Sequence, residues 1–196
     1  MTTVHLKSYY LLTFIVNLLI VLWVPIVFAE SYKVDPVHTT ILFRVKHLGV
    51  AYTYGRFNGA TGTFSFDESF PSKGSIQMQV STNNIDTNEE KRDNHLRSPD
   101  FLNAAVYPLI TFSSTSVKKI DKTHLQVAGN LTILGKTRPI TVRVSRTGFG
   151  KDPWGNFRSG FETSFIIKRS DFGMNFMLGG VSDEVKLIVS VEGIRQ

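Results

Sequence analysis

Beyond its first thirty residues, this chain of 196 residues alternates apolar and polar side chains over many short segments. Ile76, Met78 and Val80, for example, alternate with two glutamines. A period of two indicates β-strands with one face in a dry core and one face in water, which is typical of antiparallel sheets. The same alternation recurs at Ile41, Phe43 and Val45, at Leu125, Val127, Leu131 and Ile133, at Ile140, Val142 and Val144, at Phe161, Phe165 and Ile167, and at Val185, Leu187, Val189 and Val191.

These segments and the turns between them predict eight or nine strands. Turn-forming residues stand at 71–74, 119–122, 134–137 and 150–156. The predicted strands cover residues 31–46 with a break at Pro36, 55–67, 74–85, 109–118, 123–134, 138–148, 157–168 and 183–193. Eight twisted antiparallel strands can close into an up-and-down barrel, which leaves no exposed edge. We therefore predict an all-β fold, an antiparallel β-barrel of about eight strands, in a single domain over residues 30–196.

One segment, residues 88–103, breaks the alternation and predicts a short helix inserted between strands. Thr87 or Asn88 can cap its start, and Glu89 and Glu90 stand in the first turn, where the helix dipole favours acids. Pro99 begins a second short turn. A helix of this kind beside a barrel resembles a lid or a plug.

The first 29 residues predict a secretory signal peptide. Only three residues between Leu11 and Ala29 are not apolar, and Lys7 is the one positive side chain before them. Val27 and Ala29 suit the subsites of signal peptidase, so we expect cleavage before Glu30; an uncleaved anchor helix is the alternative. The chain has no cysteine, which is more usual for a bacterial periplasmic protein than for a small eukaryotic secreted domain. We therefore expect a periplasmic location.

Composition and motif spacing exclude several classes of function. The absence of cysteine excludes a disulfide scaffold, a thiolate metal site and a cysteine nucleophile. A net charge of +6 without a block of Lys and Arg does not support nucleic-acid binding. No histidine pair has zinc-site spacing, and no serine stands in a nucleophile elbow. His38 and His47 flank one predicted strand and are interpreted as structural histidines, so neither a metal site nor a catalytic site is assigned.

The inward face of the predicted barrel is rich in phenylalanine. A barrel of about eight strands is either packed solid or just wide enough for one small ligand, and alternation alone does not decide between the two. Gly55, Gly59 and Gly62 leave room or allow curvature. If the barrel is hollow, the residues expected to contact a ligand are Phe43, Phe64, Phe66, Met78, Phe112, Phe161 and Phe165.

Charged residues are expected at the mouth of this barrel. Arg92 and His95 are three apart on the predicted helix and share a face, and Arg169 and Asp171 stand where a strand leaves the sheet. They form either a polar rim that holds the head group of an amphiphile or an ion-pair network that anchors the helix. The two interpretations do not exclude each other.

Several sequence blocks, in their order along the chain, resemble the YceI-like family, also called the lipid- or polyisoprenoid-binding family. The blocks are Tyr32–His38, Ile41–Gly49, Gly55–Phe57, Gly62–Phe64, Arg92–Leu102, Tyr107–Phe112, Gly129–Pro139, Arg169–Met174 and Val181–Val185. The resemblance covers nearly all of the chain after residue 30 and implies an extended, lipocalin-like antiparallel β-barrel. It also implies a long apolar cavity that takes an isoprenoid or quinone-like chain, without implying catalysis.

Together these observations predict a periplasmic binding protein for a long-chain amphiphilic lipid, with no cofactor apart from a bound polyisoprenoid or quinone-like lipid. The alternative is an enzyme or redox accessory that acts on such a lipid, with His38, His47 or His95 as acid–base groups. A third, weaker alternative is a structural barrel with a solid core. Nucleic acid is not expected as a partner, while transient membrane contact and a homodimer are left open.

Overall fold

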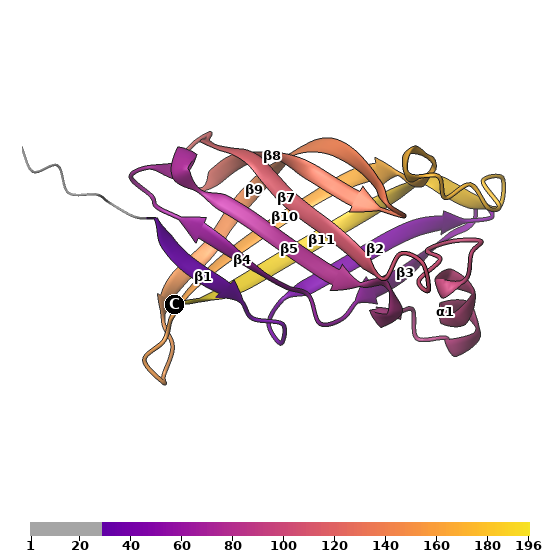
Figure 1. Cartoon of the computed structure of the whole chain (residues 1–196), viewed down its shortest axis with the longest axis horizontal. Coiled ribbons are helices and arrows are strands. Elements are labelled where there is room, and N and C mark those ends of the chain that lie inside the picture. The colour runs from indigo at the N-terminus through magenta and orange to yellow at the C-terminus, as the bar shows by residue number, and fades with distance from the viewer. Residues whose placement is uncertain (1–28) are drawn as a thin grey trace, which may run out of the picture.

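The computed structural model describes residues 29–196, an elongated antiparallel barrel with one α-helix at one end (Figure 1). The strands are β1 (Glu30–Val34), β2 (Thr40–His47), β3 (Ala51–Phe57), β4 (Thr61–Phe66), β5 (Ser75–Ser81), β6 (Ile85–Asp86), β7 (Leu109–Lys119), β8 (His124–Ile133), β9 (Lys136–Lys151), β10 (Phe157–Lys168) and β11 (Val181–Arg195). The helices are α1 (Glu90–Arg97) and the short 3-10 helices η1 (Pro71–Lys73), η2 (Thr82–Asn84) and η3 (Arg169–Phe172). The all-β prediction is confirmed.

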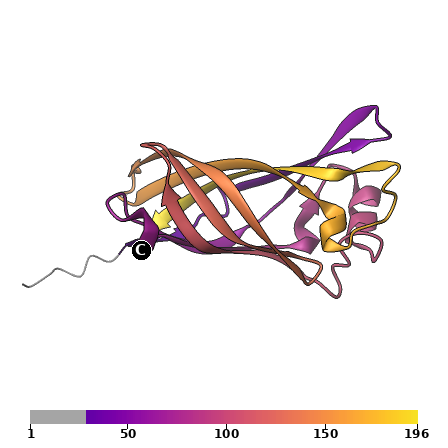
Figure 2. The ribbon, with the colours of Figure 1, turned by 90° about the horizontal axis from the view of Figure 1, so that it is seen from above.

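Eight strands close the ring in the order β1-β4-β5-β7-β8-β9-β10-β11, and β1 pairs with β11 to complete it. All neighbouring strands are antiparallel. At the other end of the barrel β2 replaces β1 beside β11, and the sheet continues through β3 to β6. Helix α1 follows β6 and lies at the same end of the barrel as the β2–β3 hairpin and the loop between β10 and β11 (Figures 1 and 2).

Three of the predicted strands are each interrupted once. The first is broken at Pro36, as predicted, and separates β1 from β2. The predicted strand 55–67 begins earlier, at Ala51, and breaks around Gly59, whose φ of +69° suits glycine. The predicted strand 74–85 is divided by η2 into β5 and β6. Because of these breaks, the two halves of a predicted strand pair at different ends of the barrel. For example, β5 pairs with β4, whereas β6 pairs with β3.

The inserted helix is confirmed, but its predicted cap is wrong. The Glu89 side chain accepts hydrogen bonds from the backbone N–H groups of Lys91 and Arg92, so it occupies the position expected for Thr87 or Asn88. Thr87 instead donates from its backbone N–H to the carboxylate of the buried Asp93. A carboxylate at the first turn also interacts favourably with the helix dipole, which explains why a glutamate can take this place.

The buried apolar side chains form two clusters along the barrel. One lies towards the end that carries η1, and it consists of Tyr32, Val34, Phe64, Phe66, Val117, Leu125, Val127, Val142 and Val144. The other lies towards α1 and consists of Phe43, Phe57, Ala60, Val80, Ile85, Leu102, Leu131, Ile133 and Phe172. Four partly buried side chains pack against both clusters, namely Met78, Phe112, Ile140 and Phe165. The inward set is the one that the alternation predicted.

An ion-pair cluster holds the break between β1 and β2. The guanidinium of Arg158 on β10 donates to the carboxylates of Asp35, Asp152 and Glu192, at 2.8 Å to Asp35 Oδ2 and 2.7 Å to Asp152 Oδ2. Burial alone raises the pKa of Asp35, but hydrogen bonds from His38 and Arg158 outweigh it and lower the pKa to about 2. Burial is likewise outweighed at Asp152, where the hydrogen bond from Arg158 is the largest factor that lowers the pKa to about 2.

We expect this cluster to make stability fall in acid. Carboxyl groups with a depressed pKa stabilise the fold fully above their unfolded pKa of about 3.9, and this contribution is lost as the pH falls to about 2. Arg158→Met should flatten the loss of thermal stability in that window, because both carboxyl groups then titrate closer to their ordinary values. Melting temperatures between about pH 5 and pH 2 measure this loss of stability.

The control is Arg138→Met, because Arg138 is exposed and has no ion pair in the described chain. An unchanged slope in Arg158→Met would contradict the prediction.

No helix within residues 29–196 is both long enough and apolar enough to cross a membrane. The predicted signal segment 1–29 lies, apart from Ala29, outside the described residues. Signal peptide and uncleaved anchor therefore remain predictions.

Candidate functional site

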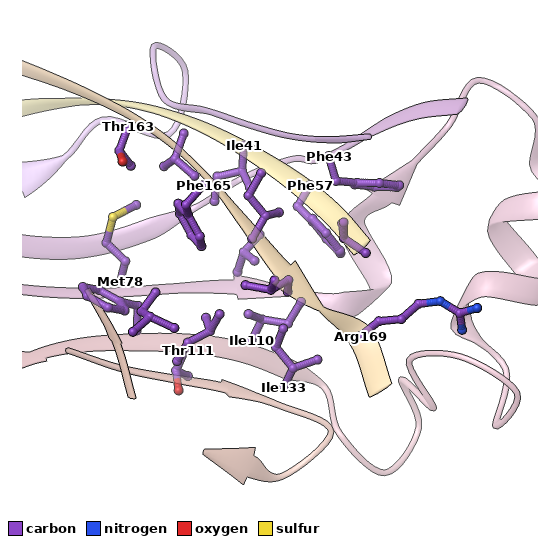
Figure 3. A pocket seen from close by; sticks show the side chains of 18 of the residues that line it. Ile41, Phe43, Phe57, Met78, Ile110, Thr111, Ile133, Thr163, Phe165 and Arg169 are labelled. Atoms are coloured by element: carbon purple, nitrogen blue, oxygen red, sulfur yellow. The ribbon is translucent and has the colours of Figure 1, made fainter. Parts of the chain in front are cut away.

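The barrel encloses an apolar cavity of about 450 Å³ that extends along its interior. Inward side chains from the strands on all sides line it, and Figure 3 shows Met78, Phe165 and Ile41 around its middle. Most small-molecule sites in proteins have volumes of about 300–1,000 Å³ and mostly apolar walls. The volume falls within this range, so the barrel is hollow and the alternative of a solid core is wrong.

All seven apolar residues predicted to contact a ligand line this cavity. They are Phe43, Phe64, Phe66, Met78, Phe112, Phe161 and Phe165. Met78, Phe112 and Phe165 lie at the waist, where they pack against both core clusters. Phe161 and Phe165 are only half-buried although they are inward residues of a closed barrel, because part of their surface faces the cavity. Their exposure distinguishes a cavity wall from a packed core.

Many further lining residues are aliphatic and were not selected from the sequence. They include Ile41 and Val45 on β2, Leu131 and Ile133 on β8, Ile140 and Val142 on β9, and Leu187 and Val189 on β11. Each belongs to an alternating set recognised in the sequence, so the signal was present. The selection favoured bulky residues, whereas the cavity is lined by aliphatic residues of the inward face as well.

Glycines make room for three of the inward phenylalanine rings. A Cβ atom placed on Gly55, Gly129 or Gly193 would lie 2.3–2.4 Å from a ring atom of Phe43, Phe112 or Phe64, respectively. Such contacts are impossible without moving the ring, so each phenylalanine ring occupies the space that a side chain at the glycine would need. The expectation that Gly55 leaves room is met by this contact.

Near Phe66, which lines the cavity at the end away from α1, an arginine lies between two aromatic rings. The guanidinium carbon of Arg146 lies 5.0 Å from the ring centre of Phe66 and 3.9 Å from that of Phe149. Glu68 accepts a hydrogen bond from Arg146 at 3.1 Å. Cation–π contacts of this geometry favour a stacked, partly desolvated guanidinium. The lining residues at this end, Phe66, Val117 and Leu125, are buried, whereas His47, Phe176 and Met177 at the α1 end are exposed, so the cavity opens beside α1.

Three of the four predicted rim residues line the cavity at this mouth, namely Arg92, His95 and Arg169. Asp171 is exposed and is not part of the lining, so its placement at the rim is incorrect. The acid that holds η3 is Asp183 on β11, whose carboxylate accepts from the backbone N–H and the hydroxyl of Ser170. The hydrogen bond from the Ser170 backbone is the largest cause that lowers the pKa of Asp183.

Arg169 is the most deeply buried charged group at the mouth, with 3% of its surface exposed. Its guanidinium donates to four backbone carbonyl groups, those of Met174, Phe176, Val181 and Ser182, at 2.8–3.0 Å. These bonds fix the loop between β10 and β11 against the barrel. Burial lowers the pKa of Arg169, while the nearby charge of Asp183 opposes that change. Within residues 29–196 no carboxylate lies within ion-pair distance of this guanidinium.

Arg92 both anchors the helix and faces the cavity. Its guanidinium donates to the hydroxyl and to the backbone carbonyl of Thr87, at 2.7 Å each, and thereby ties α1 to the end of β6. The same residue lines the mouth of the cavity. The anchoring interpretation therefore agrees with the contacts, and the head-group interpretation remains a proposal.

His95 belongs to an aromatic group that narrows the mouth. Its ring centre lies 5.0 Å from that of Phe101 and 5.3 Å from that of Phe176, and the two phenylalanine rings also touch edge to face. His95 Nε2 lies 2.8 Å from Asp100 Oδ2. This group joins α1, the turn that follows it and the β10–β11 loop. Sequence reasoning missed the two phenylalanines because neither belongs to an alternating strand.

The other two histidines that were candidate acid–base groups, His38 and His47, have different surroundings. His47 lines the mouth, whereas His38 lies outside the cavity lining and binds Asp35 Oδ2 through Nδ1 at 2.8 Å. Asp35, His38 and Glu192 come close enough together to resemble metal ligands. Arg158, however, donates to both carboxylates at this point, so a cation would have to displace a guanidinium. This donor set is that of an ion-pair cluster and does not fit a metal ion.

Comparisons with known proteins agree with this geometry. A family model described as "YceI-like domain" matches residues 32–193. A UPF0312 protein of Pseudomonas paraeruginosa is 48% identical over 170 residues, which cover 86% of this chain and 88% of the relative. The crystal structure of Burkholderia cenocepacia BcnA superposes with a TM-score of 0.75 at 25% identity, over 81% of this chain and 98% of that chain.

A more distant structure shares the fold alone. It is that of a polyisoprenoid binding domain from Saccharophagus degradans, and it superposes with a TM-score of 0.67 at 14% identity. The match covers 85% of this chain and 99% of that domain.

Proposed function

This chain belongs to the YceI-like family, and from that premise we propose that it holds one long-chain isoprenoid-type or quinone-like lipid in the barrel cavity, for transport, storage or sequestration. The observation that carries the proposal is the apolar cavity of about 450 Å³, whose exposed lining residues, polar ones among them, lie at the α1 end. A ligand of matching shape has an apolar chain and a polar end.

The energetics of such a site favour a long chain. Each CH₂ group transferred from water to an apolar cavity contributes about 0.8 kcal/mol. A chain of about ten carbons therefore contributes about 8 kcal/mol before the entropic costs of binding are subtracted. The alternating inward residues supply this burial without any specific polar contact, which suits a class of related chains better than one particular molecule.

The mouth suits the polar end of the lipid. Arg169 carries a buried positive charge, with four of its N–H donors on backbone carbonyls and no carboxylate of residues 29–196 in ion-pair contact, and Arg92 and His95 line the same cavity. Oxygen atoms of a carbonyl, hydroxyl or phosphate group are the natural partners of such donors. The polyisoprenoid-binding domain from Saccharophagus degradans shares this fold, which supports an isoprenoid-type chain as the ligand class. For this chain, the assignment rests on its own cavity and mouth.

Export to the periplasm is part of the proposal, and it rests on the sequence of residues 1–29. We expect the mature protein to begin at Glu30, because Val27 and Ala29 form the cleavage signature. N-terminal sequencing of the protein from a periplasmic extract measures this directly. A chain that begins at Met1 and sediments with membranes would support the uncleaved anchor instead.

Solvent extraction and native mass spectrometry of the protein purified from its source organism test the proposed function. We expect one lipid per barrel, with a mass that matches a long apolar chain and a small polar head. Delipidated protein should take up the same lipid again unchanged. A protein that never carries or accepts a long-chain lipid would overturn the proposal.

The enzyme alternative has one supporting observation, the hydrogen-bonded pair His95 and Asp100 at the cavity mouth. An acid–base role for His95 would require a substrate whose reacting atom lies at the mouth while its chain fills the barrel. The same mass spectrometry distinguishes the two functions. An enzyme would return a product of different mass, whereas a carrier returns the lipid that was supplied.

Arg92→Ala should lower lipid retention more than it lowers stability if this side chain contacts the head group. Arg97 is the matched control, because its guanidinium also ties α1 to neighbouring backbone, at Asn83 and Ile85, but it does not line the cavity. We expect both alanine variants to lose a similar amount of thermal stability, about 1–3 kcal/mol, and only Arg92→Ala to release lipid. Equal lipid content per folded molecule in the two variants would limit Arg92 to anchoring.

A further inference from the structure

Exposed apolar side chains gather around the open end of the barrel. Leu48 and Val50, at the tip of the β2–β3 hairpin, are 59% and 85% exposed. Tyr52 and Tyr54 follow on β3, and Met177 and Leu178 lie in the β10–β11 loop, all of them exposed. We call these six residues the mouth patch. Large apolar side chains that cluster in water mark surfaces for binding rather than for folding.

The two segments of the mouth patch are in contact with each other. The backbone N–H of Leu48 donates to the carbonyl of Gly180 at 2.7 Å, so the hairpin tip is tied to the loop. Side-chain atoms of Met177 and Leu48 both lie beside Gly180, within 3.6 Å of the position that its Cβ would take. Figures 1 and 2 place the hairpin and the loop at the same end of the barrel. The patch is therefore one continuous surface.

This surface is also continuous with the cavity. Met177 belongs both to the mouth patch and to the cavity lining, and its neighbour Phe176 lines the cavity as well. His47, next to Leu48 on the hairpin, lines the mouth too. An apolar molecule that leaves the cavity therefore reaches the patch before it reaches open water.

The charges on the hairpin that carries the patch are positive. Residues 44–56 contain Arg44, Lys46 and Arg56 but no acid, and residues 172–182 contain no charged residue. Arg56 is neutralised by Asp86 at 3.1 Å, so Arg44 and Lys46 are the cations that the patch offers. On the outer face of the hairpin, Arg44 pairs across the strands with Tyr54, and Lys46 pairs with Tyr52. The guanidinium carbon of Arg44 lies 4.0 Å from the ring centre of Tyr52. Apolar tips, amphipathic tyrosines and cationic flanks are the combination that suits the interface of an anionic bilayer.

We propose that the mouth patch docks the open end of the barrel onto the surface of an anionic lipid bilayer. Leu48, Val50 and Leu178 enter the interfacial region, and Arg44 and Lys46 meet the lipid phosphates. The consequence, which rests on the proposed function, is that a lipid passes between bilayer and cavity without exposing its whole chain to water. A second copy of the chain or a protein partner would use the apolar tip, but neither would account for Arg44 and Lys46 beside the exposed tyrosines.

Vesicle flotation tests this docking. The protein used is the chain from Glu30 onward, since every pairing that closes the barrel and both core clusters lie within it. The probes are vesicles of phosphatidylcholine alone and vesicles with equal parts of phosphatidylglycerol. We expect binding to the anionic vesicles, weakened by salt at about 1 M, which screens the contribution of Arg44 and Lys46.

The decisive variant is Leu48→Asn combined with Val50→Ser. Leu48 has a φ of +50°, a conformation that asparagine tolerates better than leucine, and neither residue lines the cavity. We expect this variant to bind anionic vesicles about ten-fold more weakly or worse, since two exposed aliphatic groups are lost. Trp154→Ser, at an 80% exposed tryptophan in the β9–β10 hairpin, is the control and should bind like the unmodified chain.

Three outcomes would overturn the docking proposal: no binding of the unmodified chain to anionic vesicles, equal binding of the double variant, or an unmodified dimer that the double variant converts to a monomer. Lipid content, measured by native mass spectrometry on the same samples, separates this test from the proposed function. A double variant that accepts lipid from detergent but does not bind vesicles supports docking. If the protein never carries lipid but still floats with anionic vesicles, docking is supported and only the proposed lipid binding in the cavity is contradicted.

Discussion

Phe165→Asp is expected to abolish lipid binding. Phe165 lies at the waist of the cavity and packs against both core clusters, so any chain that fills the barrel passes its ring. A carboxylate at this position would face apolar side chains and an apolar ligand without a partner, which costs several kcal/mol. Ile166→Asp is the matched control, because Ile166 is the next residue on β10 and is 58% exposed on the outer face. Lipid content per folded molecule, by native mass spectrometry, should fall to zero only in Phe165→Asp.

Phe165→Ala keeps this prediction testable if the aspartate variant does not fold. In a solid core, Phe→Ala costs about 3–5 kcal/mol. Beside an existing cavity the removed ring already lacks neighbours on one side, so Phe165→Ala should lower the free energy of unfolding of the delipidated protein by distinctly less than this core value. It should lower that of the lipid-loaded protein by more than that of the delipidated protein, because the contacts with the ligand disappear as well. Denaturant unfolding of both forms measures the difference. A full core penalty in the delipidated form, together with unchanged lipid content, would contradict the proposed contact.

Arg169→Met should destabilise the protein by about 3–5 kcal/mol and open the cavity mouth. The methionine fills a similar space but leaves the carbonyl groups of Met174, Phe176, Val181 and Ser182 without their donor. The β10–β11 loop can satisfy these carbonyl groups only by moving into water. We therefore expect faster hydrogen exchange in residues 173–181 and faster release of lipid than from the unmodified protein.

Two further variants separate the causes of this effect. Lys168→Met removes a neighbouring charge from an exposed position. It should change the free energy of unfolding by no more than about 0.5 kcal/mol and leave the rate of lipid release unchanged. Arg169→Lys keeps the positive charge but cannot reach four carbonyl groups from its compact ammonium, so it should resemble Arg169→Met in hydrogen exchange. If Arg169→Lys behaves like the unmodified protein, the charge rather than the hydrogen-bond geometry holds the loop.

The strand pattern was readable from the sequence because an inward position in a barrel recurs every second residue. Ile140, Val142 and Val144 illustrate this, since all three line the cavity as their spacing predicts. The break at Pro36 was readable for a similar local reason, because proline cannot donate a ladder hydrogen bond. The residue that caps the helix could not be read from the sequence, since Thr87, Asn88 and Glu89 can each accept hydrogen bonds from the first N–H groups of a helix. In the structure Thr87 is bound to Asp93, and Glu89 is the residue that caps the helix.

The sequence by itself determined the fold class, the place of the helix and most of the inward residues. All of these follow from local periodicity and turn chemistry, which act over a few neighbouring residues. The eight or nine predicted strands, in contrast, became eleven in the structure. The alternation of apolar and polar residues is the same in a solid and in a hollow barrel, so the sequence does not show whether a cavity exists. That is set by how far apart the closed strands hold inward residues such as Met78, Phe112 and Phe165.

Contacts between distant parts of the chain were decided by the tertiary structure alone. Arg158 meets Asp35 across 123 positions, and Leu48 meets Gly180 across the mouth, although neither partner carries a local sequence signal. Asp183 rather than Asp171 holds η3 for the same reason, since the strand register of β11 sets which carboxylate reaches Ser170. Barrel closure brings together segments that are far apart in the sequence, and it thereby forms the ion pairs, the anchored β10–β11 loop and the mouth patch. The separation of such segments along the chain does not tell how close they lie in space.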